Sequence, residues 1–171
     1  AAPDDPRRRL FEAMRHAAIG GGKRLRPLLV KATGDLFGLA EHSVVQVGLA
    51  VECIHVYSLV HDDLPCFDDA ATRRGQPTVH VLFGIPMAVL AGDALLTLAF
   101  ESLADVPPLL ADRALRVVRL LGRATGSAAG LIGGQSMEQS FDAGAMSVTP
   151  ELIERYQDMK TAALFQLACE A

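Results

Sequence analysis

The segment EHSVVQVGLAVECIHVYSLVHDDLP, residues 41–65, contains the longest helix that the sequence predicts. Apolar residues recur through it at three- and four-residue spacing, which is the period of an α-helix. Pro65 ends this helix, because its nitrogen has no proton to donate and its ring crowds the carbonyl of His61. We therefore expect a break near residues 62–64, beside two aspartates.

The rest of the chain continues the helical pattern. Alanine and leucine dominate, aromatic residues make up only 5%, and no segment alternates clearly with period two. Glycines at 20–22 and at 38 are natural helix stops, and Thr149 is a natural N-cap. We expect one all-α domain, residues 1–171, with helices at about 7–19, 27–37, 41–63, 86–105, 108–125, 127–141 and 150–171.

The composition narrows the class of protein. The chain has 171 residues, is 50% hydrophobic and so contains ample material for a core. Its net charge of −4 argues against nucleic-acid binding driven by global charge. Cys53, Cys66 and Cys169 form no C-x-x-C pair, so neither a disulfide framework nor a zinc site is indicated. We expect a cytoplasmic protein.

The longest apolar region is VLFGIPMAVLAGDALLTLAF, residues 81–100. Pro86 and Asp93 interrupt it, and we interpret it as a buried core helix. We therefore expect no stable membrane insertion.

Aspartates cluster where the long helix ends, in HDDLPCFDDAATRRGQPT, residues 61–78. On a continuous helix Asp62 and Asp68 would point about 120° apart, whereas a break after Asp63 can aim both at one point. Two convergent carboxylates suit Mg²⁺, which takes its remaining ligands from water and phosphate. A solvated acidic helix end is the simpler alternative.

Basic residues near these aspartates suggest a bound anion. Arg73 and Arg74 follow within a few residues, and a guanidinium matches the geometry of phosphate. In GGGKRLRP, residues 20–27, Lys23, Arg24 and Arg26 lie between a glycine turn and a helix start, where backbone amides favour anions, although a solvated basic turn fits equally well. Together these residues indicate a Mg²⁺–diphosphate site. His55 precedes Asp62 by two helical turns and shares its face.

At this point the sequence resembles the trans-isoprenyl diphosphate synthases, or polyprenyl synthetases. The matching segments are GGKRLRP, IHVYSLVHDDLPCFD, RRGQPT, LAGDALLTLAFE, LIGGQSME and MKTAAL, in the family's order. The resemblance implies antiparallel helices around a deep cavity and a homodimer. It also implies Mg²⁺-dependent head-to-tail condensation of isopentenyl diphosphate with an allylic diphosphate.

The resemblance also assigns roles to individual residues. Asp62 and Asp68, with Asp63 beside them, correspond to metal ligands. Tyr57 and Ser58 correspond to the residues that limit product length, and an aromatic at 57 favours a farnesyl product. Asp62, Asp68, Arg73 and Lys160 are the expected catalytic residues. The expected substrate contacts are Lys23, Arg26, His55 and Arg74 for isopentenyl diphosphate, Arg73, Lys160 and Thr161 for the allylic diphosphate, and Gln135.

Four positions depart from the family pattern. Ala70 and Ala71 replace further aspartates, and Met159 stands where histidine is frequent. Glu138 stands where aspartate is usual, and it shares a helix face with Gln135. We expect metal binding to survive because Asp62 and Asp68 remain. A polar patch inside the bundle, already satisfied by its neighbours, is an equally good interpretation of Gln135 and Glu138.

The family's second aspartate-rich motif lies beyond the position of Lys160 and is not found before Ala171. We therefore expect an incomplete synthase domain that lacks its C-terminal helices and is inactive by itself, although a naturally short chain is an alternative. A non-catalytic regulatory subunit is the main competing function, but it has no physical need for Asp62, Asp68, Arg73 and Arg74. A Mg²⁺ phosphohydrolase would need a water-activating group that the sequence does not offer.

Overall fold

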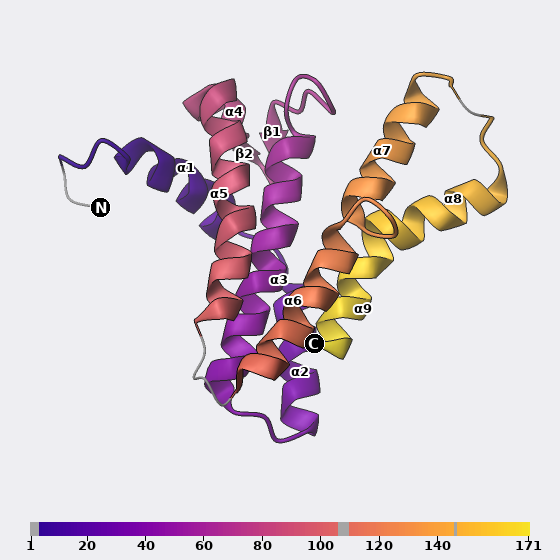
Figure 1. Ribbon diagram of the computed structural model, residues 1–171. Coiled ribbons are helices and arrows are strands. Elements are labelled where there is room, and N and C mark those ends of the chain that lie inside the picture. Colours follow the sequence, from indigo (N-terminus) through magenta and orange to yellow (C-terminus); the bar gives the residue numbers. More distant parts are fainter. Residues whose placement is uncertain (1–3, 106–109, 146) are drawn as a thin grey trace. The chain divides into compact units, whose positions relative to one another are not determined.

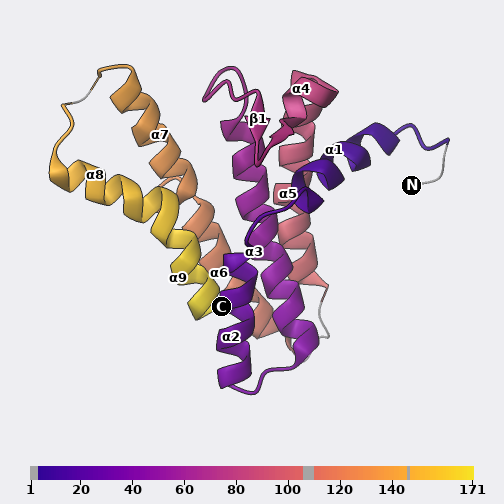
Figure 2. The ribbon, with the colours of Figure 1, turned by 180° about the vertical axis from the view of Figure 1, so that it is seen from behind.

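The computed structural model describes residues 4–105, 110–145 and 147–171, and this part of the chain is mainly helical (Figures 1 and 2). The all-α prediction is confirmed. The elements are α1 (Arg8–Ile19), α2 (Leu25–Leu36), α3 (Glu41–Asp62), β1 (Thr72–Arg73), β2 (Gln76–Pro77), α4 (Val79–Phe83), α5 (Ile85–Ala104), α6 (Ala111–Thr125), α7 (Leu131–Asp142), α8 (Pro150–Gln157), the π-helical turn η2 (Asp158–Ala162) and α9 (Ala163–Glu170).

The chain divides into two compact units. Unit 1 consists of Ala1–Arg24 and Glu52–Glu101, and unit 2 of Leu25–Val51 and Ser102–Ala171. The boundaries fall inside α3 and α5, so both units contain parts of these helices. The single domain expected from the sequence stays a prediction.

In unit 1, α5 runs antiparallel to α3, and the two helices lie side by side in Figures 1 and 2. Nε2 of His61, in the last turn of α3, lies 3.1 Å from the carbonyl oxygen of Val89 in α5. Gly92 makes this approach possible, because a Cβ there would lie 2.1 Å from the same His61 nitrogen. Core side chains come from both helices, from α4 and from the loop that follows α3: Val56, Val60, Leu64, Val79, Ala88, Ala91 and Leu95.

In unit 2, α7 and the run from α8 to α9 form a helical hairpin, which both ribbon views show (Figures 1 and 2). Thr149 caps α8, since its hydroxyl accepts from the amide of Leu152, as its N-cap position predicts. Helix α9 also packs against α2 and α6. The buried core of this unit includes Val30, Val44, Leu121, Leu164 and Leu167.

The expected helix boundaries differ from the observed ones in three places. The helix expected from Pro108 begins at Ala111 among the described residues, and Pro108 itself lies outside them. The helix expected from residue 127 begins only at Leu131, because the chain turns tightly over the end of α6 at Gly130. A Cβ at Gly130 would lie 2.4 Å from the carbonyl oxygen of Arg123. The short α4 and the two-residue strands were not predicted.

Two helices, α3 and α5, are long and apolar enough to cross a membrane. Within the most apolar window of each, 61% of α3 and 33% of α5 is buried inside the protein. Buried core helices of soluble proteins meet the same criterion, so length and composition alone are weak evidence here. The expected lack of membrane insertion stays a prediction.

Candidate active site

The aspartate-rich loop begins where α3 ends at Asp62, which confirms the expected break before Pro65. The main chain then folds back on the helix end. The amide of Asp68 donates to the carbonyl of Asp62 at 2.9 Å, and the amide of Asp69 donates to that of Leu64 at 3.1 Å. Main-chain hydrogen bonds therefore return Asp68 to the helix terminus that carries Asp62.

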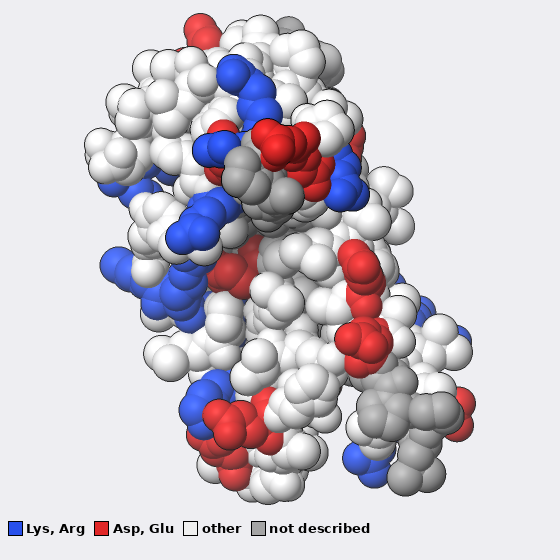
Figure 3. All heavy atoms as spheres, turned by 90° about the vertical axis from the view of Figure 1, so that its left-hand side faces the viewer, with Lys and Arg blue, Asp and Glu red and all other residues white. Residues whose placement is uncertain are grey.

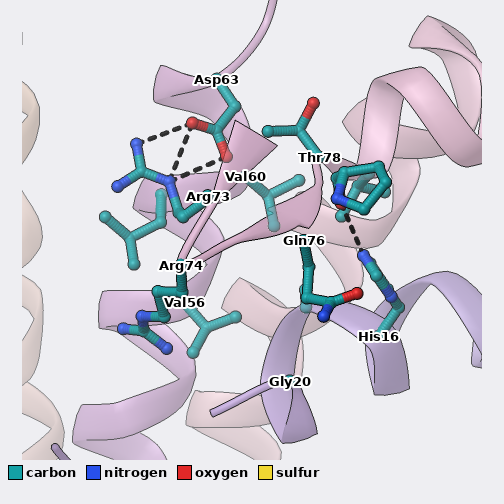
Figure 4. Close-up of a pocket in the computed structure, with 13 residues that line it drawn as sticks. His16, Gly20, Val56, Val60, Asp63, Arg73, Arg74, Gln76 and Thr78 are labelled. Atoms are coloured by element: carbon teal, nitrogen blue, oxygen red, sulfur yellow. Dashed lines mark hydrogen bonds and ion pairs between the residues drawn. The ribbon is translucent and has the colours of Figure 1, made fainter. Parts of the chain in front are cut away.

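Asp63 binds Arg73 on β1 (Figure 4). Nε of Arg73 donates to Oδ1 and Oδ2 of Asp63 at 2.8 and 2.9 Å, and Nη2 lies 2.6 Å from Oδ1. Asp63 is only 4% exposed. Both oxygens of Asp63 therefore already accept from a cation, and the expected role of Asp63 as a metal ligand stays a prediction.

The aspartates also set the charge state of Arg73. Its pKa is raised above the usual value, first by the hydrogen bond to Asp63 and further by the negative charges of Asp63, Asp62 and Asp68, against the opposing effect of burial. Arg73 is therefore a permanent cation within the field of three carboxylates. The hairpin of β1 and β2, with Arg73 opposite Gln76, holds the guanidinium in this position.

Arg74 reaches back to the glycine turn that precedes Lys23. Its Nη1 donates to the carbonyl oxygen of Gly21 at 2.6 Å. Gly22 has a φ of 112°, which favours glycine, and a Cβ there would lie 2.4 Å from the same Nη1, so the guanidinium would have to shift to make room for it. The fold thus brings Arg74 close to the backbone that carries Lys23, and the side chains of both residues are exposed.

Backbone strain concentrates in these same segments. Among the described residues, the non-glycine positions with positive φ are Arg24, Asp69 and Arg74, at 50°, 48° and 54°. Left-handed backbone is costly for such residues and often marks a functional site. Arg24 is held by an ion pair with Glu52 and a hydrogen bond to the carbonyl of Ala18. Sequence reasoning did not identify Glu52, which has no local motif.

A small pocket lies beside the Asp63–Arg73 pair, lined by α1, α3 and the hairpin (Figure 4). His16 enters it from α1, with Nε2 at 2.8 Å from the carbonyl oxygen of Pro77. Thr78 closes another side, and its hydroxyl donates to the carbonyl of Ala70 at 2.8 Å. These contacts attach the hairpin to its surroundings. Sequence reasoning missed His16, because its partner is a main-chain atom 61 residues away.

The carboxylates at the end of α3 supply only part of a usual Mg²⁺ ligand set. Among the described residues, no group of three or more His, Cys, Asp and Glu is placed to hold a metal ion. Asp63 is bound to Arg73, and the other two carboxylates, Asp62 and Asp68, are hard oxygen donors that act electrostatically on the same guanidinium. One or two carboxylates plus phosphate oxygens are a usual ligand set for Mg²⁺. The residues suit a metal that arrives with a phosphate ligand, not an all-protein cage.

The two residues expected to limit product length lie on α3, one turn before Asp62. Tyr57 is 5% exposed, its ring stands edge-on to His61, and its hydroxyl has no hydrogen-bond partner among the described residues. Burial, with a smaller effect of the Asp62 charge, raises the pKa of Tyr57 to about 12. Ser58 is also buried and donates to the carbonyl of His55 at 2.9 Å, while His55 itself is half-buried.

In unit 2, the carboxylate of Glu138 in α7 accepts from two residues of the facing helix. Nζ of Lys160 donates to one oxygen and the hydroxyl of Tyr156 donates to the other. Lys160 lies in the π turn η2, a feature that is frequent at functional sites. The glycines of LIGGQSME allow this contact, since a Cβ at Gly134 would lie 2.6 Å from the amide nitrogen of Lys160.

The other expected substrate contacts of unit 2 are Gln135, Thr161 and Arg26. Both polar atoms of the Gln135 side chain are buried without a hydrogen-bond partner among the described residues. Buried polar groups are almost always paired, so this amide has unused hydrogen-bonding capacity, and its contact with substrate stays a prediction. Thr161 is exposed. The guanidinium of Arg26 stacks over the ring of Phe165 at 4.4 Å, a contact that the sequence did not suggest.

On the face drawn in Figure 3, Lys and Arg are interspersed with Asp and Glu. No single sign of charge covers this face. Local pairs such as Asp63–Arg73 therefore determine the electrostatics of each site more than a global field does.

Fold and site together define a helical protein of the isoprenoid synthase fold class, with an aspartate-rich helix end and neighbouring cations. The family model for polyprenyl synthetase matches residues 7–171, and the chain belongs to this family. The chain is 48% identical over 161 residues to farnesyl diphosphate synthase of Escherichia coli (strain K12), covering 93% of this chain and 53% of that protein. It is 47% identical over 160 residues to the chloroplastic geranylgeranyl pyrophosphate synthase 11 of Arabidopsis thaliana, covering 92% and 44%.

The fold has a close match among solved structures. The apo crystal structure of an FPP/GFPP synthase from Zymomonas mobilis superimposes with a TM-score of 0.92 at 48% identity, covering 100% of this chain and 62% of that one. The expected isoprenoid synthase fold is therefore confirmed. The chain spans about half the length of the curated relatives that it matches.

Proposed function

We propose that the protein containing this chain is a prenyltransferase that condenses isopentenyl diphosphate head-to-tail with an allylic diphosphate. The family membership and the near-50% identity to a farnesyl diphosphate synthase support this proposal. The observation that carries it is the placement of Asp62, Asp68 and Arg73 in one electrostatic group at the end of α3.

We assign the metal site to Asp62 and Asp68. Mg²⁺ bound there together with the allylic diphosphate would neutralise the negative charge that develops as the carbon–oxygen bond breaks. Asp63 has a separate task in this proposal, since it holds Arg73 in place.

The protein's own cations stabilise the leaving diphosphate. Arg73 carries its charge at every physiological pH and is fixed by Asp63 before any substrate arrives, so little reorganisation is needed during the reaction. Lys160 and Thr161 of unit 2 are assigned to the same diphosphate by resemblance. Each factor of ten in rate requires about 1.4 kcal/mol of such stabilisation, which a few charged contacts in a water-poor site can supply.

The second substrate is assigned to the other basic group. Arg74 lies over Gly21 and Gly22, next to the backbone of Lys23, and the two exposed cations suit the diphosphate of isopentenyl diphosphate. Arg26 and His55 are assigned to the same substrate by resemblance. No protein nucleophile is required, because the isopentenyl double bond attacks the allylic carbocation that remains when diphosphate departs. The new carbocation then loses a proton, and by resemblance the released diphosphate accepts it.

The buried ring of Tyr57, one turn from Asp62, supports a fifteen-carbon product. Bulk at this position would stop a growing chain near the metal site. The curated relatives include both farnesyl and geranylgeranyl synthases, so farnesyl diphosphate is proposed on the strength of Tyr57 alone.

We further propose a cytoplasmic homodimer. Apolar side chains stay exposed along α4 and α5, as a surface that packs against a second copy would require. They are Val81, Leu82, Ile85, Val89 and Leu90. Light scattering after gel filtration, with and without detergent, distinguishes a defined dimer from a detergent-bound membrane protein.

The test of function is an assay with isopentenyl diphosphate, geranyl diphosphate and Mg²⁺. It uses the product of the complete reading frame and, in parallel, residues 1–171. We expect farnesyl diphosphate from the product of the complete reading frame, and a loss of at least about a hundredfold in Asp62→Ala and Asp68→Ala with unchanged circular dichroism. Near-normal turnover in both variants at saturating Mg²⁺ would contradict the metal assignment, and no product from the wild-type complete reading frame would contradict the function.

A further inference from the structure

The carboxylate of Glu138 binds Lys160 and is itself held by a third residue, Tyr156. The hydroxyl of Tyr156 donates to Oε1 of Glu138, which leaves Oε2 for Nζ of Lys160. The side chains of Glu138 and Lys160 are 25% and 19% exposed, so the pair is largely shielded from water. Two donors on the two oxygens of one carboxylate define its orientation.

Glutamate needs such a restraint more than a shorter acid would. It has one more rotatable bond than the aspartate that is usual here, and each ordered bond has an entropy cost. Tyr156 is well placed to supply the restraint, because its ring is packed edge-on against Phe141 at a centroid distance of 6.0 Å. The packed ring of Tyr156 therefore holds its hydroxyl next to the flexible side chain of Glu138.

The main chain adds to this arrangement. Gly133 and Gly134 let α7 approach η2 so closely that a Cβ would meet Met159 or the backbone of Lys160. Tyr156 and Lys160 flank the start of the π turn, and Nζ of Lys160 lies 5.9 Å from the centre of the Tyr156 ring. Tyr156 thus touches both members of the ion pair.

We propose that Tyr156 is a positioning residue that fixes Glu138 and, through it, the ammonium of Lys160. This inference rests on the proposed function only where it assigns that ammonium to an allylic diphosphate. The positioning itself is a property of the free protein.

The free protein allows a direct test, because residues 1–171 contain three lysines, Lys23, Lys31 and Lys160, which separate peptides can report. Brief acetylation with acetic anhydride, followed by peptide mass spectrometry, measures the reactivity of Lys160 relative to Lys31. Lys31 is an internal reference on α2, where it pairs with Asp35 and is 60% exposed. Tyr156→Phe removes the hydroxyl and keeps the ring.

We expect Tyr156→Phe to raise the Lys160 to Lys31 ratio about threefold, and Glu138→Gln to raise it further, with unchanged circular dichroism. Phe141→Leu is the matched comparison, since it keeps the hydroxyl and only loosens the ring that aims it, and it should raise the ratio less than Tyr156→Phe does. An unchanged ratio in Tyr156→Phe would overturn the inference. An equal rise in Phe141→Leu would also overturn it, because ring packing would then be the cause.

A second measurement separates this inference from the proposed function. Titration of the longer protein with geranyl S-thiolodiphosphate and Mg²⁺ should give a dissociation constant about threefold higher for Tyr156→Phe than for the wild type. If the wild type does not bind this analogue, the proposed function fails, while the acetylation ratio still decides whether Tyr156 positions Lys160.

Discussion

Asp63 accepts three contacts of 2.6–2.9 Å from Arg73, across a loop that separates them by ten residues in sequence. The carboxylate is almost completely buried, whereas about a third of the arginine side chain is exposed. The second aspartate of the acidic motif is therefore part of the protein's framework and differs in role from its neighbour Asp62.

Removing Asp63 should cost stability, and removing Asp68 should not. We expect Asp63→Ala to lower the free energy of unfolding by about 2 kcal/mol or more, because the half-buried guanidinium of Arg73 loses its partner. Asp68→Ala is the matched control and should change it by less than about 0.5 kcal/mol, since Asp68 is exposed. Urea unfolding followed by circular dichroism measures both, and equal effects would contradict the separation of roles.

The proposed role of Tyr57 in limiting product length can be tested by substitution. In an active protein, Tyr57→Ala should shift the product from fifteen carbons to twenty or more, because the bulk one turn from Asp62 is removed. Tyr57→Phe keeps the bulk and should keep the product. Chromatography of the dephosphorylated products reads the chain length, and an unchanged distribution in Tyr57→Ala would place the end of the cavity elsewhere.

The same tyrosine predicts a pH effect. The pKa of Tyr57 rises from its ordinary value of 10.0 to about 12 on folding, so above pH 10 the unfolded chain releases a proton that the folded chain keeps. Stability should therefore fall as the pH rises from 10 to 12, with a loss of about 1 kcal/mol by pH 11. Tyr57→Phe should lack this component.

The measurement is the difference in unfolding free energy between Tyr57→Phe and the wild type at pH 8, 9, 10 and 11. Burial also raises the pKa of the Cys53 thiol, to about 11, but this contribution is common to both proteins and cancels. A difference that stays constant over this range would mean that the Tyr57 phenol ionises normally in the folded protein.

Two helical glycines should respond oppositely to alanine. Gly134→Ala places a methyl group 2.6 Å from the amide nitrogen of Lys160 and should destabilise unit 2 by about 2 kcal/mol or more. At Gly122, inside α6, no described atom lies within 4 Å of the place that an added Cβ would take, so Gly122→Ala should stabilise by about 0.5–1 kcal/mol. Thermal unfolding of the two variants compares them, and a tolerated alanine at 134 would show that α7 and η2 can move apart.

The sequence predicted the long helices well, because their signals are local. Pro65 ends α3 within a residue or two of the expected position, and Thr149 caps α8 as expected. The two-residue strands escaped notice because a period-two pattern cannot be read from two residues. The late start of α7 depends on a close contact between Gly130 and α6, which no local pattern reveals.

The sequence predicted which residues form the candidate site better than it predicted which of them bind one another. The motifs identified Asp62, Asp68, Arg73 and Lys160, but not that Asp63 would bind Arg73. Ion pairs across ten or more residues depend on tertiary geometry, as Arg24 with Glu52 also illustrates. Tyr156 belongs to no motif, and its contact with Glu138 depends on the packing of α8 against α7, which no local pattern predicts.

The acidic loop keeps its shape through main-chain hydrogen bonds, while the side chains of Pro65, Cys66 and Phe67 are exposed. Pro65 is needed to end α3, but the side chains of Cys66 and Phe67 take no part in these main-chain hydrogen bonds. The distance along the chain from Asp62 to Asp68 is constrained, while positions 66 and 67 are open to substitution. Cys66 in particular offers a thiol for a fluorescent or spin label, which would report on ligand binding from within the motif itself.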